Sequence, residues 1–278
     1  MDWKGREQSQ NVEDRRGSSG GGGGKAPGIL GIIVVLVGAY YGVDLSGLVG
    51  TPSMGTGSTQ TSQLKPQEEA ELNELARVVL ADTEKAWGSY FKQIGRTYTP
   101  TTMVLYNGGT STACGMGQSA MGPFYCPGDQ KVYLDLDFYR DMQTKLNSAS
   151  DAAFAYVIAH EVGHHVQNLL GILPKVHRIQ QQVGKKEANA LSVKLELQAD
   201  CYAGIWGHYA VNNNIFKPED IPKAMLAAES VGDDRLQKEG QGYVVPDSFT
   251  HGSSEQRMAW LKRGLESGDI NQCNTFGN

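Results

Sequence analysis

An uncharged apolar segment near the N-terminus constrains this chain more than any other feature. The run from Ala26 to Val43 has 18 residues and no charged side chain. At about 1.5 Å per residue a helix of that length spans about 27 Å, close to the thickness of a bilayer core. The segment therefore predicts a transmembrane helix within residues 26–50. A cleaved signal peptide and a buried core helix fit less well, since no A-x-A-like site follows and the flanking linkers offer nothing to pack against.

Basic residues are distributed unevenly around this segment. Arg15, Arg16 and Lys25 precede it, and the next basic residue is Lys65. Positive charge is normally retained on the cytoplasmic side of a membrane. We therefore expect a single-pass protein with its N-terminus in the cytoplasm and the bulk of the chain outside.

Composition divides the chain into four regions. Residues 1–25 are polar and Gly-rich and predict a disordered cytoplasmic arm, and residues 26–50 are the predicted anchor. Residues 51–65, rich in Thr, Ser and Gly, predict a flexible linker, and residues 66–278 predict one domain. With 25 basic and 30 acidic residues the formal net charge is −5, which argues against a nucleic-acid partner.

The domain is predicted to be α+β, mainly helical with a small sheet. Apolar spacing and helix-end signals predict helices over Glu68–Phe91, Asp151–Leu170, Glu187–Val211, Pro218–Asp233 and Ser253–Arg263. Alternating apolar residues predict strands at Thr102–Tyr106 and Lys131–Leu136. Capping-box spacing is expected to start two of the helices, at Ser148 and at Ser253.

Four cysteines lie in the predicted domain, namely Cys114, Cys126, Cys201 and Cys273. An even number on the outer side of a membrane predicts two disulfides rather than four free thiols. Of the three pairings, Cys114 with Cys126 is favoured because it closes a short Gly-rich loop, and this leaves Cys201 for Cys273. A zinc site made of cysteines is not expected, because the chain has no C-x-x-C pair.

The sequence His160-Glu161-Val162-Gly163-His164 lies within a predicted helix. Residues i and i+4 share a helical face, so the two imidazoles can bind one metal ion. Glu161 lies next to that face, where its carboxylate can take a proton from an attacking water. This pattern is typical of zinc peptidases and predicts Zn²⁺ as the cofactor. A partly buried polar patch without metal is the alternative.

Two histidines leave zinc short of a ligand. Position 170 is Leu, so the third histidine of the H-E-x-x-H-x-x-G-x-x-H variant is missing. Glu196 and Asp200 are also spaced i, i+4, on a second predicted helix among apolar residues, where unpaired acids would be costly. We expect Glu196 to be the third ligand and Asp200 to accept a hydrogen bond from a zinc-binding imidazole. An exposed amphipathic face is the alternative.

The H-E-x-x-H motif followed by E-x-x-x-D on a later helix resembles the gluzincin peptidases, and more narrowly the bacterial neutral zinc metallopeptidase family (YpfJ-like). The resemblance lies in Trp3–Arg6, Asn11–Gly17, Tyr125–Pro127, Val132–Asp135, His160–Gln167, Glu196–Trp206 and Thr250–Arg257. It implies a zincin-like fold and an endopeptidase that acts on peptide or protein substrates. Together with the predicted anchor, it places the catalytic domain on the periplasmic or extracellular face of a bacterial inner membrane. It also suggests that the strand Lys131–Leu136 is a sheet edge that pairs with substrate.

His251 and Arg257 lie six residues apart, as in membrane-linked gluzincins. The resemblance implies that they bind the oxyanion of the tetrahedral intermediate. Helix capping by His251 and a surface ion pair for Arg257 are the alternatives. His165, His177 and His208 show no such pattern and are expected to be structural or surface residues. A catalytically inactive, membrane-anchored binding or scaffold protein is the competing function; the presence of both metal histidines, Glu161 and Glu196 argues against it.

Overall fold

The computed structural model describes residues 1–17 and 62–277. The helices are α2 (Pro66–Gln93), α3 (Phe138–Thr144), α4 (Asp151–Leu169), α5 (Ile172–Gln180), α6 (Lys185–Asn212), α7 (Ile221–Ser230), α8 (Asp233–Gln241) and α9 (Ser254–Ser267). The strands are β1 (Val12–Asp14), β2 (Thr102–Leu105), β3 (Gly109–Thr112), β4 (Gly115–Gln118), β5 (Phe124–Cys126) and β6 (Lys131–Leu134). Short 3₁₀ turns include η5 (Ile270–Cys273). The predicted α+β class, mainly helical with a small sheet, is consistent with this architecture.

Four strands form one sheet in the order β1-β2-β6-β5. β1 and β6 run parallel to β2, and β5 runs antiparallel to β6, whereas β3 and β4 form a separate hairpin. The central strands β2 and β6 carry apolar or aromatic side chains on both faces. In β2, for example, Met103, Val104 and Leu105 are fully buried. Such continuous apolar runs are typical of a strand covered on both sides. The two predicted strands are confirmed as β2 and β6, and the other strands were not predicted.

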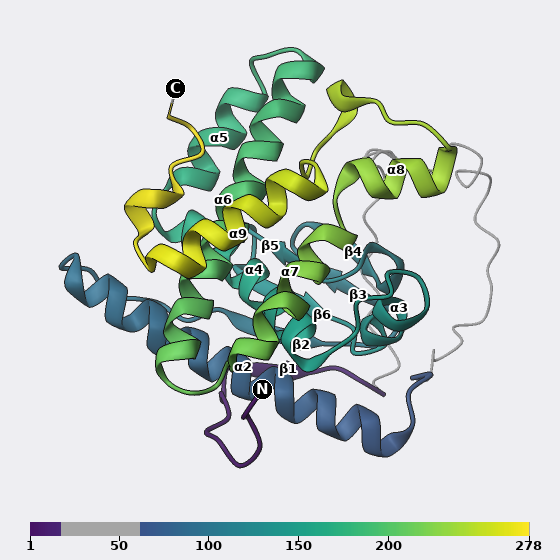
Figure 1. The fold of residues 1–278 in the computed structure, drawn as a ribbon, viewed down its shortest axis with the longest axis vertical. Coiled ribbons are helices and arrows are strands. Elements are labelled where there is room, and N and C mark those ends of the chain that lie inside the picture. The colour runs from purple at the N-terminus through teal and green to yellow at the C-terminus, as the bar shows by residue number, and fades with distance from the viewer. Residues whose placement is uncertain (18–61, 278) are drawn as a thin grey trace.

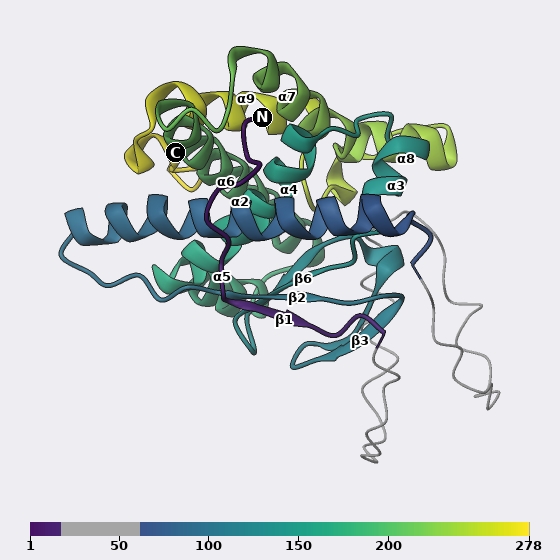
Figure 2. The same cartoon turned by 90° about the horizontal axis from the view of Figure 1, so that it is seen from below.

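The helices form layers around the buried α4. Figure 2 shows the four-stranded sheet on one side of α2, with α6, α7 and α9 on the other side. Large side chains fill the space between these layers, among them Trp87, Phe154 and Trp206, each almost completely buried. Figure 1 shows α4 in the centre of the molecule, crossed by α6 and α9. The helix that carries the H-E-x-x-H motif is therefore held by packing from several directions.

Two glycines allow α9 to lie directly on α6. A Cβ atom added to Gly264 would lie 1.9 Å from the backbone oxygen of Cys201, and one added to Gly204 would lie 2.2 Å from the backbone oxygen of Leu261. No other residue type fits between backbones at these distances. The close contact brings the first turn of α9 next to the middle of α6.

The predicted helix ends differ from the structure most clearly at three places. The predicted helix 218–233 is interrupted after Ser230, and a new helix starts at Asp233. Ser150, not Ser148, caps α4, because its side chain accepts the Ala153 N–H at 3.0 Å. The last helix continues through Gly264 to Ser267, since that glycine is required by the contact with α6. The predicted capping box at Ser253 is confirmed.

Residues 1–17 are part of the folded domain. Val12–Asp14 pairs with Met103–Leu105 as an edge strand of the sheet. The Trp3 side chain is only 4 % exposed, and its indole N–H donates to Asp151 Oδ2 at 2.7 Å at the start of α4. The prediction of a disordered arm is therefore wrong for these residues. It failed because a three-residue strand and one buried indole leave no apolar periodicity.

The predicted transmembrane helix and single-pass inner-membrane localisation are also corrected. Within residues 1–17 and 62–277 no helix is long and apolar enough to span a bilayer, and the predicted span 26–50 lies outside the described residues, as does most of the linker 51–65. Moreover, β1 and β2 are neighbouring strands of one sheet, which places their backbones about 4.8 Å apart. The N-terminal arm and the domain are therefore parts of one folded unit.

Both predicted disulfides are confirmed. Cys114–Cys126 ties the β3–β4 hairpin to β5, and Cys201–Cys273 ties α6 to η5. The second bond closes a loop of 72 residues that includes α7, α8 and α9. Closing a long loop restricts the unfolded chain more than closing a short one.

Candidate metal centre

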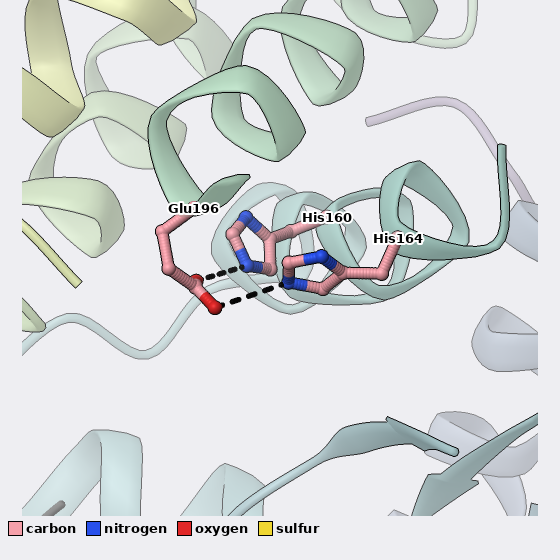
Figure 3. Close-up of side chains that lie close together, drawn as sticks. All are labelled: His160, His164 and Glu196. Carbon is pink, nitrogen blue, oxygen red and sulfur yellow. Dashed lines mark hydrogen bonds and ion pairs between the residues drawn. The ribbon is translucent and has the colours of Figure 1, made fainter. Parts of the chain in front are cut away.

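Three side chains from two helices converge on one point. His160 and His164 come from α4 and Glu196 from α6, and their ligand atoms lie within 4.8 Å of one another. Figure 3 shows both imidazoles turned toward the Glu196 carboxylate. His160 Nε2 lies 3.0 Å from Glu196 Oε2, and His164 Nε2 lies 3.3 Å from Glu196 Oε1. The structure thus brings together the three residues that the sequence predicts as metal ligands.

These distances fit a zinc ion. Zinc binds imidazole nitrogen and carboxylate oxygen at about 2.0–2.2 Å in a tetrahedral arrangement, which places neighbouring ligand atoms about 3.3–3.5 Å apart. The two measured separations, 3.0 and 3.3 Å, are close to that value. Two histidines and one glutamate also match the ligand set of catalytic zinc sites, in which the fourth position is open to water or substrate.

Gly163 allows the two ligand helices to approach each other. A Cβ atom at this position would lie 3.0 Å from the backbone oxygen of Ala199 and 3.3 Å from its Cα. Gly163 occupies the second unspecified position of the H-E-x-x-H motif. Because it has no side chain, α4 can contact α6 directly there. This contact sets the distance between the two histidines and Glu196.

Asp200 is the centre of a buried network behind His160. Its Oδ1 atom accepts hydrogen bonds from His160 Nδ1 at 2.8 Å and from the Tyr156 hydroxyl at 2.6 Å. Arg257 donates to both carboxylate oxygens, at 2.8 and 3.0 Å, and also to the backbone oxygen of Val231. A hydrogen bond to Nδ1 leaves Nε2 of His160 as the atom that faces the metal position. Asp200 thus occupies the place predicted for it.

Gln167 has the same relation to His164. Its Oε1 atom accepts a hydrogen bond from His164 Nδ1 at 2.9 Å, one turn along the same helix. Its Nε2 atom donates to the backbone oxygen of Leu195 on α6 at 2.8 Å. Both imidazoles are therefore oriented by an acceptor at Nδ1, so that each presents Nε2 to Glu196.

The electrostatics of the centre favour a positive charge between these side chains. Burial opposes ionisation of Glu196, but the neighbouring His164, His251 and His160 outweigh it and hold the pKa of its carboxyl well below the ordinary value. Burial alone would lower the pKa of His160, but Asp200 and Glu196 outweigh burial and raise it to about 10. The site thus favours a positive charge, which a divalent cation would supply.

Glu161 lines the same cavity as the three ligands. This cavity has a volume of about 390 Å³ and reaches from α4 to β5 and α5. Glu161 is 8 % exposed, and burial raises the pKa of its carboxyl against the opposing effect of His160 and His164. A buried carboxylate with raised proton affinity beside a metal position is suited to take a proton from water.

The chain matches the family described as "putative neutral zinc metallopeptidase" over residues 1–276. It belongs to this family. Among curated relatives, the uncharacterized protein YpfJ of Escherichia coli K12 is 53 % identical, over all of this chain and 99 % of YpfJ. The uncharacterized protein Rv2575 of Mycobacterium tuberculosis H37Rv is 40 % identical over 74 % of this chain and 73 % of its own length. No solved structure matches the chain.

Membership of this zinc metallopeptidase family agrees with the ligand geometry. Zinc is implied by the family description, and the His160, His164 and Glu196 group has the composition and spacing that zinc requires. The match begins at residue 1, so the family includes the N-terminal arm that packs on the sheet. The arm is therefore a part of this metallopeptidase fold.

Both His251 and Arg257 line the cavity, and the Arg257 side chain is the more buried of the two. The Oδ2 atom of Asp233 accepts the backbone N–H groups of Thr250, His251 and Gly252 at 2.8, 2.6 and 3.1 Å. Its Oδ1 atom lies 3.3 Å from His251 Nδ1, so one carboxylate holds this whole loop. Arg257 is 4 % exposed and bonded to Asp200, which differs from a surface ion pair.

Sequence reasoning missed Tyr156, Gln167 and Asp233. Tyr156 lies four residues before His160 on α4, and this i, i+4 spacing was the signal that could have shown it. Gln167 lies three residues after His164 on the same helix and offered a similar signal, whereas Asp233 offered none because its partners lie on a separate segment. His165 is buried, as expected for a structural residue: Nε2 donates to the Thr99 carbonyl at 2.7 Å, so Nδ1 accepts from the Tyr125 hydroxyl at 3.0 Å.

Proposed function

We propose that this protein is a zinc-dependent endopeptidase that hydrolyses peptide bonds in peptide or protein substrates. One observation carries the proposal: Nε2 of His160, Nε2 of His164 and the Glu196 carboxylate meet at zinc-ligand spacing, in a cavity that Glu161 also lines. A metal site with three protein ligands, an adjacent buried carboxylate and a cavity has the parts needed for hydrolysis.

A zinc ion held by His160, His164 and Glu196 would act as a Lewis acid on the scissile carbonyl and make water more acidic. Glu161 takes the proton from the attacking water and passes it to the leaving amine. Its raised pKa suits both transfers, because the carboxylate must accept a proton and then release it to a more basic nitrogen.

His251 is the side chain we propose for the developing oxyanion. It lines the cavity, and Asp233 Oδ1 lies 3.3 Å from its Nδ1, where the carboxylate can orient the ring. Arg257 is instead a positioning residue, because its guanidinium donates to both oxygens of Asp200, which in turn orients His160.

An extended substrate is proposed to add to strand β5. The predicted strand Lys131–Leu136 is not a sheet edge, because β6 lies between β2 and β5. β5 ends the four-stranded sheet, and Phe124 and Tyr125 of this strand line the cavity. An unpaired strand edge next to the metal position can bind a peptide backbone by β-strand addition.

The proposal is tested with two glutamate variants of the full chain. Glu161→Gln should retain zinc, because Glu161 is not a ligand, and should lose at least about 10²–10⁴-fold in turnover. Glu196→Ala should lose both zinc and activity, because two imidazoles are an incomplete ligand set. Zinc is quantified in the purified proteins, and hydrolysis is followed on a mixture of unstructured peptides.

Two results would contradict the proposal. An unaltered rate in Glu161→Gln would show that this carboxylate is not the base. Stoichiometric zinc without hydrolysis in the wild type, on peptides of varied sequence, would favour a zinc-binding scaffold.

A further inference from the structure

A chain of buried side chains connects the zinc ligand His164 to a disulfide. Gln167 accepts from His164 Nδ1 at 2.9 Å and donates from its Nε2 to Gln198 Oε1 at 3.0 Å. Gln198 in turn donates from its Nε2 to the backbone oxygen of Cys273 at 3.0 Å. Cys273 is bonded to Cys201 on α6. We call Gln167 and Gln198 the glutamine relay.

The direction of the relay is determined by two backbone carbonyls. A carbonyl oxygen can only accept a hydrogen bond, so the amide nitrogen of Gln167 must face Leu195 O, and that of Gln198 must face Cys273 O. The remaining amide oxygen of Gln167 then faces His164. His164 must carry its proton on Nδ1 and present the lone pair of Nε2 to the metal position.

The relay is buried from end to end. Gln167 and Cys273 have no exposed surface, and Gln198 is 4 % exposed. Water cannot easily replace a lost partner at such positions, so removing one amide leaves its neighbour with an unsatisfied polar group. Each side chain of the relay therefore depends on the next one for its hydrogen-bond partner.

Residues 270–276, which we call the strap, hold the part of α6 that supplies Glu196. Besides the disulfide at Cys201 and the hydrogen bond from Gln198, Thr275 Oγ1 donates to the backbone oxygen of Lys194 at 2.6 Å. These attachment points lie before and after Glu196 along the helix. The strap is thus attached to α6 on both sides of the third ligand.

We propose that Gln167 and Gln198 are positioning residues through which the strap and its disulfide control how tightly the centre binds zinc. The inference rests on the proposed zinc site. Outer partners of a ligating histidine fix the ring orientation and the proton-bearing nitrogen, and their loss typically weakens metal binding about 10–100-fold. Here the outer partner Gln167 is itself held, through Gln198, by a segment that is attached to α6 by one disulfide and two hydrogen bonds.

Zinc dissociation constants, measured on the full chain by competition with a chelator, test this proposal. Gln167→Met and Gln198→Met should each raise the constant, with the larger rise, about 10–100-fold, for Gln167→Met. Gln180→Met is the matched control: this glutamine also joins two helices, through Ala188 O and Ser192 Oγ, but contacts no ligand. Gln180 lines the same cavity, but its amide bonds to Ala188 and Ser192 and not to a ligand, so the constant of this variant should stay within about twofold of the wild type.

Disulfide variants test the origin of the effect. Cys201→Ala/Cys273→Ala should weaken zinc binding, whereas Cys114→Ala/Cys126→Ala should not. Adding Gln198→Met to the first pair should produce little further weakening, because both changes break the same connection. If Cys201→Ala/Cys273→Ala does not fold, the glutamine variants still decide the question.

A cobalt spectrum separates positioning from general stability. Co²⁺ loaded in place of zinc reports ligand geometry through its visible absorption, which should change in Gln167→Met and stay unchanged in Gln180→Met. Unaltered spectra and zinc constants in both relay variants, with a wild type that binds zinc, would overturn the relay and leave the proposed function intact. A zinc-binding wild type that hydrolyses no peptide would overturn the function and leave the relay intact.

Discussion

Arg257 in α9 and Asp200 in α6 form a buried two-point ion pair, with Nε 2.8 Å from Oδ2 and Nη2 3.0 Å from Oδ1. Burial raises the cost of the charge on Asp200, but Arg257 and His160 outweigh it and hold the pKa of this carboxyl near 2. The pair connects the packing of α9 on α6 to the metal centre, because Asp200 also accepts from His160 Nδ1. The ion pair can form because Gly264 lets α9 lie directly against α6.

Replacing Arg257 with Leu is expected to lower the free energy of unfolding by about 3–5 kcal/mol, since a buried carboxylate loses its charged partner. The measurement is urea unfolding of the metal-free protein. Lys262→Leu on the same helix is the control; Lys262 is exposed and pairs with Glu266, so its loss should cost less than about 0.5 kcal/mol. Equal effects of the two variants would show that the ion pair does not support the fold.

Replacing Gly163 with Ala is expected to separate α4 from α6, because the new Cβ would lie 3.0 Å from the backbone oxygen of Ala199. Overpacking of this kind typically costs about 1–3 kcal/mol, and zinc affinity should fall with it because Glu196 moves away from the histidines. Gly240→Ala on α8 is the control, since nothing lies within 4 Å of its added Cβ. Thermal unfolding and zinc titration of both variants check the prediction, and unweakened zinc binding by Gly163→Ala would contradict it.

The buried carboxyl of Asp233 is expected to make the free energy of unfolding depend on pH. Burial opposes its ionisation, but hydrogen bonds from the His251 side chain and from the backbone of His251 and Thr250 outweigh burial and lower the pKa of this carboxyl. A group with a lowered folded-state pKa stabilises the protein above its unfolded value, about 3.9, and this contribution is lost as pH falls through the folded value. Asp233→Asn should therefore be less stable than wild type at pH 7, and the difference should narrow below about pH 4.

The free energy of unfolding of metal-free wild type and Asp233→Asn, measured between pH 3 and pH 7, provides this comparison. A difference that stays constant across the range would mean that the charge of Asp233 contributes nothing to holding the His251 loop.

Variants of Trp3 test whether the N-terminal arm is packed as part of the domain. Trp3→Ala should cost about 3–5 kcal/mol, as is usual for removing a buried aromatic side chain. Trp3→Phe should cost less, about 1–2 kcal/mol, because the ring remains and the hydrogen bond to Asp151 is lost. Gln10→Ala, at an exposed arm position, is the control. If all three variants unfold like the wild type, the arm does not pack as the structure shows.

Helical periodicity made the ligand set predictable. His160 and His164 share a face wherever residues 151–169 are helical, and the same holds for Glu196 and Asp200. The chemistry of zinc ligands then required a third donor, and acids among apolar residues supplied it. The Cys114–Cys126 pairing was likewise predictable, because the two residues are separated by only 12 positions.

The role of Arg257, the glutamine relay and the position of the N-terminal arm were decided by the tertiary structure. Arg257 meets Asp200 across 57 positions and Gln198 meets Cys273 across 75, so no local spacing predicts either contact. The arm was misread because its three-residue strand is stabilised by pairing with β2, not by a pattern of its own. By itself the sequence determined which side chains can bind a metal, since one helical turn sets their spacing. How those side chains are oriented was determined by the packing of α4, α6, α9 and the strap, since hydrogen bonds between distant segments form only once the helices are in contact.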